Sequence, residues 1–208
     1  VTGSGLKRLE VTEGVPYYNA ADEGMPVVAL LQYAEIEPDD DKKAKAVGYA
    51  EDIMRWKLMV TDNRPNPFGY PVLESKEENQ IVEKFFFPHH STAAPWWQGD
   101  NARIASIAAA CAELSRVTVD EELAARCRRM VQDPLDWIMG LNPFDSCMIE
   151  GYGRNNIQYF FKQRYDFINC PGGIVNGITS GLTDEQGISF VQHQIPEIDD
   201  NCRWAEQW

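Results

Sequence analysis

Acid–base chemistry is suggested first by the closing segment of the chain, "DDNCRWAEQW". Trp204 and Trp208 lie four residues apart, so in a helix they share one face and Glu206 points away from it. Asp199 and Asp200 come six or seven residues before Glu206. An apolar setting with like charges raises the pKa of a carboxyl group, and a general acid requires such a raised pKa. The ordinary alternative is a solvated helix glutamate, because Glu is seldom buried without a partner.

Metal and cofactor chemistry is not indicated. His89 and His90 are adjacent in a loop, where neighbours rarely bind one ion, and no nearby Cys or Glu-x-x-His completes a ligand set. The sequence also lacks a G-x-S-x-G nucleophile motif, a P-loop and a strand followed by G-x-G-x-x-G. We therefore expect no metal site and no cofactor, although loops such as "TDNRPN" offer oxygens for a structural calcium ion.

Aromatic residues are frequent in the segments that we expect to be loops. Such rings either plug the core or form flat platforms for the apolar C–H faces of sugar rings, and the core interpretation is the more frequent one. The aromatic residues in question are Trp96, Trp97, Tyr152, Tyr159, Phe160 and Phe161.

The composition excludes some classes of partner. The 208 residues are 44% hydrophobic, which fits a single domain with a sizeable core. The formal net charge of −13 argues against nucleic acid, which requires a basic surface. An acidic cleft suits neutral or cationic substrates, while simple solubility would need no partner at all. The longest apolar runs fall far short of the ~20 residues of a membrane helix, so no membrane partner is expected.

The cysteines are dispersed among apolar neighbours and show no C-x-x-C spacing, so neither a zinc site nor a redox motif is indicated. We expect mostly reduced, packed thiols, with a disulfide still open. The five residues are Cys111, Cys127, Cys147, Cys170 and Cys202.

Hydrophobic periodicity predicts two helical hairpins. In the first, residues 24–37 and 39–58 each carry one apolar stripe, and Pro38 separates them. In the second, a helix from Asp100 or Asn101 is followed by one from Asp120.

Proline and glycine set further limits on these elements. Pro134 is expected to kink or split the last helix, and Gly140 to end it. Residues 61–98 and 142–198 look irregular, so the predicted fold class is all-α, one domain over residues 1–208 with long irregular loops.

Four segments together resemble the family 9 glycoside hydrolases, which include many cellulases. "PWWQGDNARIASIAAACAEL" is similar to the family's Trp-Gly-Ser-Asn stretch and the helix that follows it. "LDWIMGLNPFDSCMIEGYG" resembles the Gly-x-Asn-Pro segment with its Gly-aromatic-Gly turn, and "PGGIVNGI" resembles Pro-Gly-x-x-x-Gly-Gly. "DDNCRWAEQW" resembles the aspartate-rich lead into the catalytic glutamate. The matching positions of the second segment are Asp136, Gly140, Asn142, Pro143, Ser146, Gly151 and Gly153.

The chain also departs from this family's pattern. "RNNIQYFFKQRYDF" stands where the family has a His-His-Arg substrate motif, and Ala205 replaces the Asn before the catalytic glutamate. The Asp-Ala-Gly-Asp motif that supplies the catalytic base is missing, and we reject the similar "NAADEG" at 19–24, which lies too near Glu206.

The resemblance implies a fold, a mechanism and a site. The fold would be part of an (α/α)6 toroid, with the chain a C-terminal fragment whose partner is the remaining N-terminal half. The activity would be inverting hydrolysis of a β-linked glycan or oligosaccharide, with Glu206 as general acid, Asp199 or Asp200 beside it and the base upstream. Trp96, Trp97, Tyr152 and Arg154 would contact the sugar, and the family suggests a periplasmic or secreted protein.

Two other classes of function remain open. One is a non-catalytic carbohydrate-binding or structural toroid, which the missing motifs favour. The other is a toroid polysaccharide lyase or sugar epimerase; lyases favour acidic polymers, which a chain of net charge −13 would repel.

Overall fold

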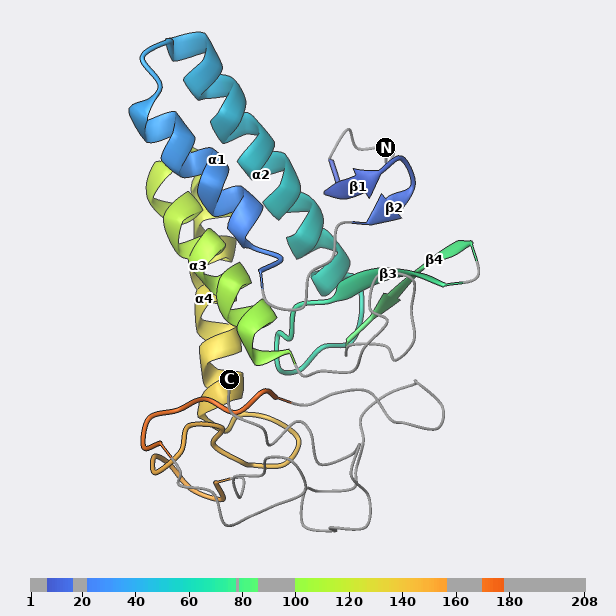
Figure 1. The fold of residues 1–208 in the computed structure, drawn as a ribbon, viewed down its shortest axis with the longest axis vertical. Coiled ribbons are helices and arrows are strands. Elements are labelled where there is room, and N and C mark those ends of the chain that lie inside the picture. The colour runs from blue at the N-terminus through green and yellow to red at the C-terminus, as the bar shows by residue number, and fades with distance from the viewer. Residues whose placement is uncertain (1–6, 17–21, 78, 86–99, 157–169, 178–208) are drawn as a thin grey trace.

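The computed structural model describes residues 7–16, 22–77, 79–85, 100–156 and 170–177, and within them the chain is mostly helical (Figure 1). Two helical hairpins lie side by side, and two short antiparallel ribbons lie beside the second helix. In chain order the elements are β1 (Glu10–Thr12), β2 (Val15–Pro16), α1 (Met25–Ile36), α2 (Asp40–Asp62), β3 (Leu73–Glu77), β4 (Gln80–Lys84), α3 (Asn101–Val117) and α4 (Glu121–Met139).

The first hairpin follows the sequence prediction. α1 ends before Pro38, which disfavours helical geometry at Glu37, and Glu37 is extended. Asp39 then caps α2, since its carboxylate accepts the backbone N–H groups of Asp41 at 3.0 Å and Lys42 at 3.2 Å.

The second hairpin differs from the prediction at Pro134. Asp120 caps α4 by accepting two backbone N–H groups, and Gly140 ends the helix at a φ of 121° that favours glycine. α4 is nevertheless one continuous helix, so of the two outcomes expected at Pro134, a kink or a split, the split does not occur. Trp137 and Ile138, beyond the proline, are buried in a core cluster, and this packing compensates for the lost backbone hydrogen bond.

A β-ribbon occupies part of the region that was expected to be loop. β3 and β4 pair antiparallel from Leu73 opposite Lys84 to Glu77 opposite Gln80. Glu74 faces Glu83 in this register, and Glu74 is buried whereas Glu83 is exposed. A carboxylate on the buried side of a strand breaks the usual apolar–polar alternation, which explains why the ribbon was not predicted.

The main core lies between the two hairpins. α1 packs against α3, and small residues at the helix contacts, such as Ala50, Ala110 and Cys111, are fully buried. A second core cluster, which contains Ile104, Trp137 and Val175, joins the lower ends of α3 and α4 to the loops that follow. This second cluster fixes those loops to the helices.

Four of the five cysteines lie in the described part of the chain and all four are free thiols. Cys111, Cys127 and Cys147 are buried, as expected for packed thiols, while Cys170 is exposed. Cys202 lies outside the described residues.

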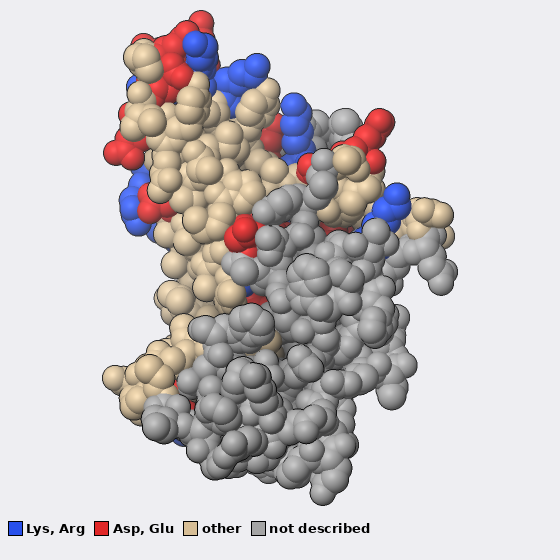
Figure 2. All heavy atoms as spheres, viewed as in Figure 1, with Lys and Arg blue, Asp and Glu red and all other residues tan. Residues whose placement is uncertain are grey.

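The surface charge is unevenly distributed. Charged side chains gather at the turn between α1 and α2, whereas much of the described surface over α1 and α3 is uncharged (Figure 2). The exposed residues of α1 and α3 include Met25, Ala29, Tyr33, Ala102 and Ala109. Across the described helices, none combines the length and the apolar character that a membrane crossing requires.

Candidate functional site

Three of the four segments behind the family resemblance extend into the described residues. These parts meet at the N-terminal end of α3 and the C-terminal end of α4. Asn101, at the start of α3, donates its backbone N–H to the carbonyl of Asn176 at 3.0 Å. Its side-chain amide donates to the carbonyl of Val175 at 2.9 Å. Val175 in turn donates its N–H to Met148, in the segment after α4, at 3.0 Å. Residues 101, 148 and 175, far apart in sequence, are therefore directly hydrogen-bonded.

Asn142 determines the shape of the loop after α4. Its amide N–H groups donate to the carbonyls of Trp137 at 2.9 Å and Ser146 at 2.8 Å. Its amide oxygen accepts the backbone N–H groups of Phe144 and Ser146. A buried amide with all its hydrogen bonds satisfied holds the backbone in one arrangement.

At two positions of the motif segments only glycine fits, because a side chain would collide with a neighbour and the backbone φ is positive. Gly153 has a φ of 66°, and a Cβ there would lie 2.6 Å from the Cβ of Cys147. Gly177 has a φ of 104°, and its Cβ would lie 2.7 Å from the side chain of Asn101. Both positions are strained for other residues, so these glycines allow the loops to approach each other closely.

Two of the predicted sugar contacts, Tyr152 and Arg154, lie on the turn formed by residues 151–156. Tyr152 is 58% exposed. The Arg154 guanidinium pairs with Asp145 at 2.7 Å, and both side chains are exposed. The amide of Asn156 donates to the carbonyls of Cys147, Ile149 and Tyr152 at 3.1, 2.8 and 2.7 Å, so the turn is held from within. Tyr152 and Arg154 are thus available to a ligand from a well-fixed backbone.

The other predicted site residues lie outside the described residues. They are Trp96, Trp97, Asp199, Asp200 and Glu206.

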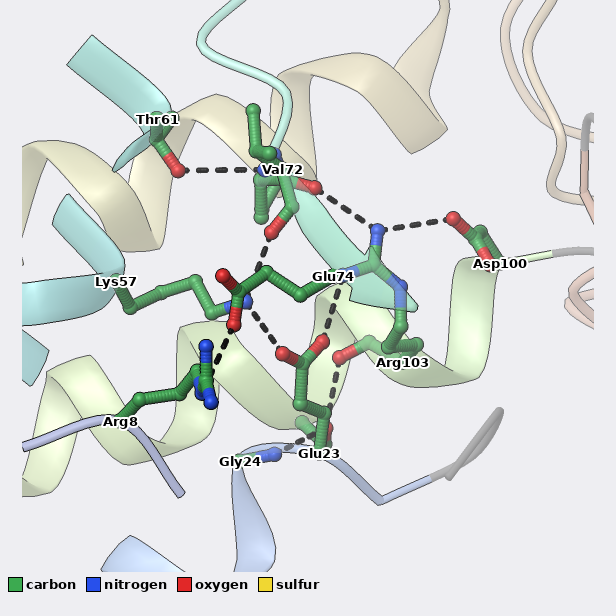
Figure 3. Close-up of polar contacts among 11 residues, drawn as sticks. Arg8, Glu23, Gly24, Lys57, Thr61, Val72, Glu74, Asp100 and Arg103 are labelled. Carbon is green, nitrogen blue, oxygen red and sulfur yellow. Dashed lines mark hydrogen bonds and ion pairs between the residues drawn. The ribbon is translucent and has the colours of Figure 1, made fainter. Parts of the chain in front are cut away.

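A buried ionic cluster, which the sequence analysis missed, positions the start of α3 (Figure 3). Glu23 accepts hydrogen bonds from Lys57 of α2 and from Arg103 of α3, the latter at 2.7 Å. Arg103 also donates to Asp100 at 2.9 Å, and the Tyr70 hydroxyl donates to the same oxygen at 2.7 Å. The cluster therefore ties the segment before α1 to both hairpins.

The pKa values in the cluster follow from burial and from the two cations. Burial raises the pKa of Glu23, but the charges of Lys57 and Arg103 outweigh it, and the net pKa is lowered. Burial raises the pKa of Asp100, and the charge of Arg103 together with the hydrogen bonds from Arg103 and Tyr70 only partly offsets this rise. Burial and the neighbouring Asp100 carboxylate raise the pKa of Tyr70 well above its usual range. Glu23 is thus an ion held by two cations, and Tyr70 stays a neutral donor.

A sequence signal for this cluster did exist. Lys57 lies seven residues after Ala50 and three after Met54, on the apolar stripe of α2. A lysine at that spacing indicates a buried cation that needs a carboxylate partner. The sequence did not reveal the partner, because Glu23 lies in a different segment of the chain.

Glu74 lies at the edge of this cluster, beside a cavity of about 20 Å³, enough for one water molecule. Arg8 approaches its carboxylate at 3.5 Å. Burial raises the pKa of Glu74 to about 7, against the lowering effect of the charges on Arg8 and Lys57. The folded protein therefore holds a proton on Glu74 at pH values where the unfolded chain has lost it.

We expect the free energy of unfolding to fall as the pH rises from about 4.5 to 7, because a carboxyl with a raised folded pKa favours the folded state at low pH. At about 1.4 kcal/mol per pKa unit, a rise of the pKa from 4.5 to about 7 corresponds to a contribution of at most about 3.5 kcal/mol. Urea unfolding between pH 5 and 8 should show this slope in the wild type and a smaller one in Glu74→Gln. Glu35→Gln, which changes an exposed glutamate of α1, is the control. Equal slopes in the wild type and Glu74→Gln would contradict the assignment.

Comparison with known proteins provides no family assignment. Neither a scan against protein-family models nor a search of curated proteins returned a match to this chain.

Proposed function

We propose that the chain is the C-terminal part of the catalytic domain of an inverting glycoside hydrolase of the family 9 type. The observation that carries the proposal is the assembly around Asn101, Asn142 and Val175, which brings three separate motif segments to one end of α3 and α4. A resemblance by chance would not require its matching segments to contact one another.

The same proposal includes an (α/α)6 toroid. Such a ring repeats helical hairpins side by side, and the contact between α1 and α3 is of that kind. The largely uncharged part of the surface over α1 and α3 in Figure 2 is where the remaining N-terminal half of the barrel would pack. A second half is also needed for the chemistry, since the chain supplies one of the two catalytic carboxylates.

In the proposed mechanism, Glu206 protonates the oxygen of the leaving sugar while a carboxylate upstream of this chain activates water on the opposite face. In inverting enzymes the two carboxyl groups lie about 6.5–9.5 Å apart, which leaves room for the water. A like charge from Asp199 or Asp200 would raise the pKa of Glu206, as a general acid requires. Tyr152 offers its exposed ring to the sugar, with Trp96 and Trp97, and Arg154 donates hydrogen bonds to hydroxyl groups. No step requires a cofactor.

The stereochemistry of the product tests the proposal. We expect the full-length protein, with a neutral β-linked oligosaccharide, to release the α-anomer first, as followed by proton NMR before mutarotation. Early release of the β-anomer would contradict inversion. An unsaturated product that absorbs in the near ultraviolet would instead establish a lyase. Sugar binding without turnover would indicate a non-catalytic toroid.

A further inference from the structure

The loop 142–156 contains two residues with positive φ that are not glycine. Asp145 has a φ of 49° and Asn155 a φ of 52°. Residues other than glycine adopt this region infrequently, and Asp and Asn do so more readily than most. The two residues are also linked, since the Asn155 amide donates to the carbonyl of Asp145 at 2.9 Å. The backbone is thus held in a shape that directs the Asp145 carboxylate toward the following turn.

The Asp145 carboxylate holds the guanidinium of Arg154. Nη2 and Nε of Arg154 donate to Oδ1 of Asp145 at 2.7 and 3.2 Å. The two side chains are 57% and 78% exposed, and an ion pair so exposed contributes only about 0–1 kcal/mol to stability. The larger consequences of the contact are that the guanidinium is oriented and that its charge is compensated.

Arg154 shares its turn with the exposed Tyr152. A Cβ on Gly172 would lie 3.9 Å from Cε2 of Tyr152, so the backbone of the 170–173 turn supports one side of the ring. The N–H groups of Arg154 that do not bind Asp145 can donate hydrogen bonds to neutral oxygen atoms, such as sugar hydroxyl groups. Asp145 and Glu150 give the turn two carboxylates against one guanidinium, which disfavours an anionic ligand.

We propose that Asp145 is a positioning residue that orients and neutralises Arg154, so that the surface around Tyr152 and Arg154 binds an uncharged sugar and rejects a sugar carboxylate. This inference rests on the proposed function, because it treats that surface as part of the substrate site. It adds a residue, Asp145, whose effect on the ligand is exerted through Arg154.

The test compares the binding of two ligands to the full-length protein by calorimetry. The ligands are a neutral β-linked oligosaccharide that the wild type cleaves and its counterpart of equal length and linkage with uronic acid units. For Asp145→Asn we expect the Kd of the neutral sugar to rise about tenfold, as for the loss of one charge-assisted contact. We expect the Kd of the charged sugar to fall. Asn tolerates the backbone of position 145, so the variant should fold.

Two further variants separate positioning from a structural role. Asp145→Glu should restore part of the preference for the neutral sugar. Asp62→Asn is the matched control, because it removes another exposed pair, with Arg126 at 2.6 Å, and it should leave both Kd values unchanged. A wild type that cleaves the neutral sugar, together with unchanged Kd values in Asp145→Asn, would overturn the inference and leave the proposed function intact. A wild type that binds neither sugar would overturn both.

Discussion

Glu206→Gln is expected to lower kcat by about 10²–10⁴-fold in the full-length protein, the range for loss of a general acid. Glutamine is nearly isosteric with glutamate but has no proton to give to the leaving sugar. The variant should unfold at the same urea concentration as the wild type, and its KM should change little. The measurement is the initial rate of sugar release from a neutral β-linked oligosaccharide, with the unfolding curve recorded on the same preparation.

The control for this result is Glu35→Gln, which changes an exposed glutamate of α1. The competing interpretation of Glu206 as a solvated helix residue predicts that both variants keep full activity. Equal turnover in Glu206→Gln and the wild type would therefore remove the glycosidase proposal. A substrate with a good leaving group provides an independent check, because it needs less proton donation and should recover most of the lost rate.

The helices could be predicted from the sequence because their signals are local. Asp39 and Asp120 stand directly before apolar periodicity, and Gly140 stands directly after it. Each of these residues contacts backbone groups only a few positions away in the sequence. The sequence alone therefore shows which groups it contacts. Pro134 does not split α4, and the sequence could not show this because the packing that retains the helix comes from residues contacted through the tertiary fold.

The ionic cluster could not be predicted, because its members come from separate parts of the chain. The contact between Glu23 and Arg103 joins residues 80 positions apart, and that between Tyr70 and Asp100 joins residues 30 apart. Asp100 or Asn101 was expected to cap α3; Asp100 is the N-cap residue, yet its side chain makes no capping hydrogen bond. It binds Arg103 and Tyr70 instead, because a buried cation forms a stronger contact with a carboxylate than a backbone N–H does.

The roles of the predicted sugar contacts stay predictions, and the structure describes only two of these residues. The motif residues Tyr152 and Arg154 lie on an exposed turn, as a ligand contact requires, and Asn142 has a structural role that its position in the motif did not disclose. The contact between Asp145 and Arg154 was not foreseen, because a side-chain pair in an irregular loop follows no periodicity. Backbone conformations such as the positive φ of Asp145 are likewise set by the loop as a whole.

Gly24→Ala is expected to lower the free energy of unfolding by about 3 kcal/mol or more, because the added methyl group would overlap the backbone of α3. Gly24 has an ordinary φ of −81°, so alanine is acceptable for its backbone conformation. The added Cβ would, however, lie 2.1 Å from the carbonyl oxygen of Ser106 and 2.7 Å from the backbone nitrogen of Ile107. Because α3 cannot yield there by a side-chain rotation, α1 must move away from it.

That movement would also affect the ionic cluster. Gly24 donates its N–H to the Ser106 hydroxyl at 3.0 Å, and Glu23 precedes it directly. A shift of this segment would lengthen the contacts of Glu23 with Lys57 and Arg103, so that Lys57 would lose the carboxylate it pairs with and Arg103 one of its two. The substitution should therefore destabilise the protein more than the overlap alone would.

The matched control is Gly48→Ala in α2, where an added Cβ meets no atom within 4 Å. There the same methyl group should stabilise the protein by about 0.5–1 kcal/mol, because alanine loses less backbone entropy than glycine in a helix. If α1 and α3 are in backbone contact at Gly24, urea unfolding will show a lower free energy of unfolding for Gly24→Ala and a higher one for Gly48→Ala. A Gly24→Ala variant as stable as Gly48→Ala would mean that the two hairpins do not pack in this way, and the proposed side-by-side arrangement of a toroid would lose its support.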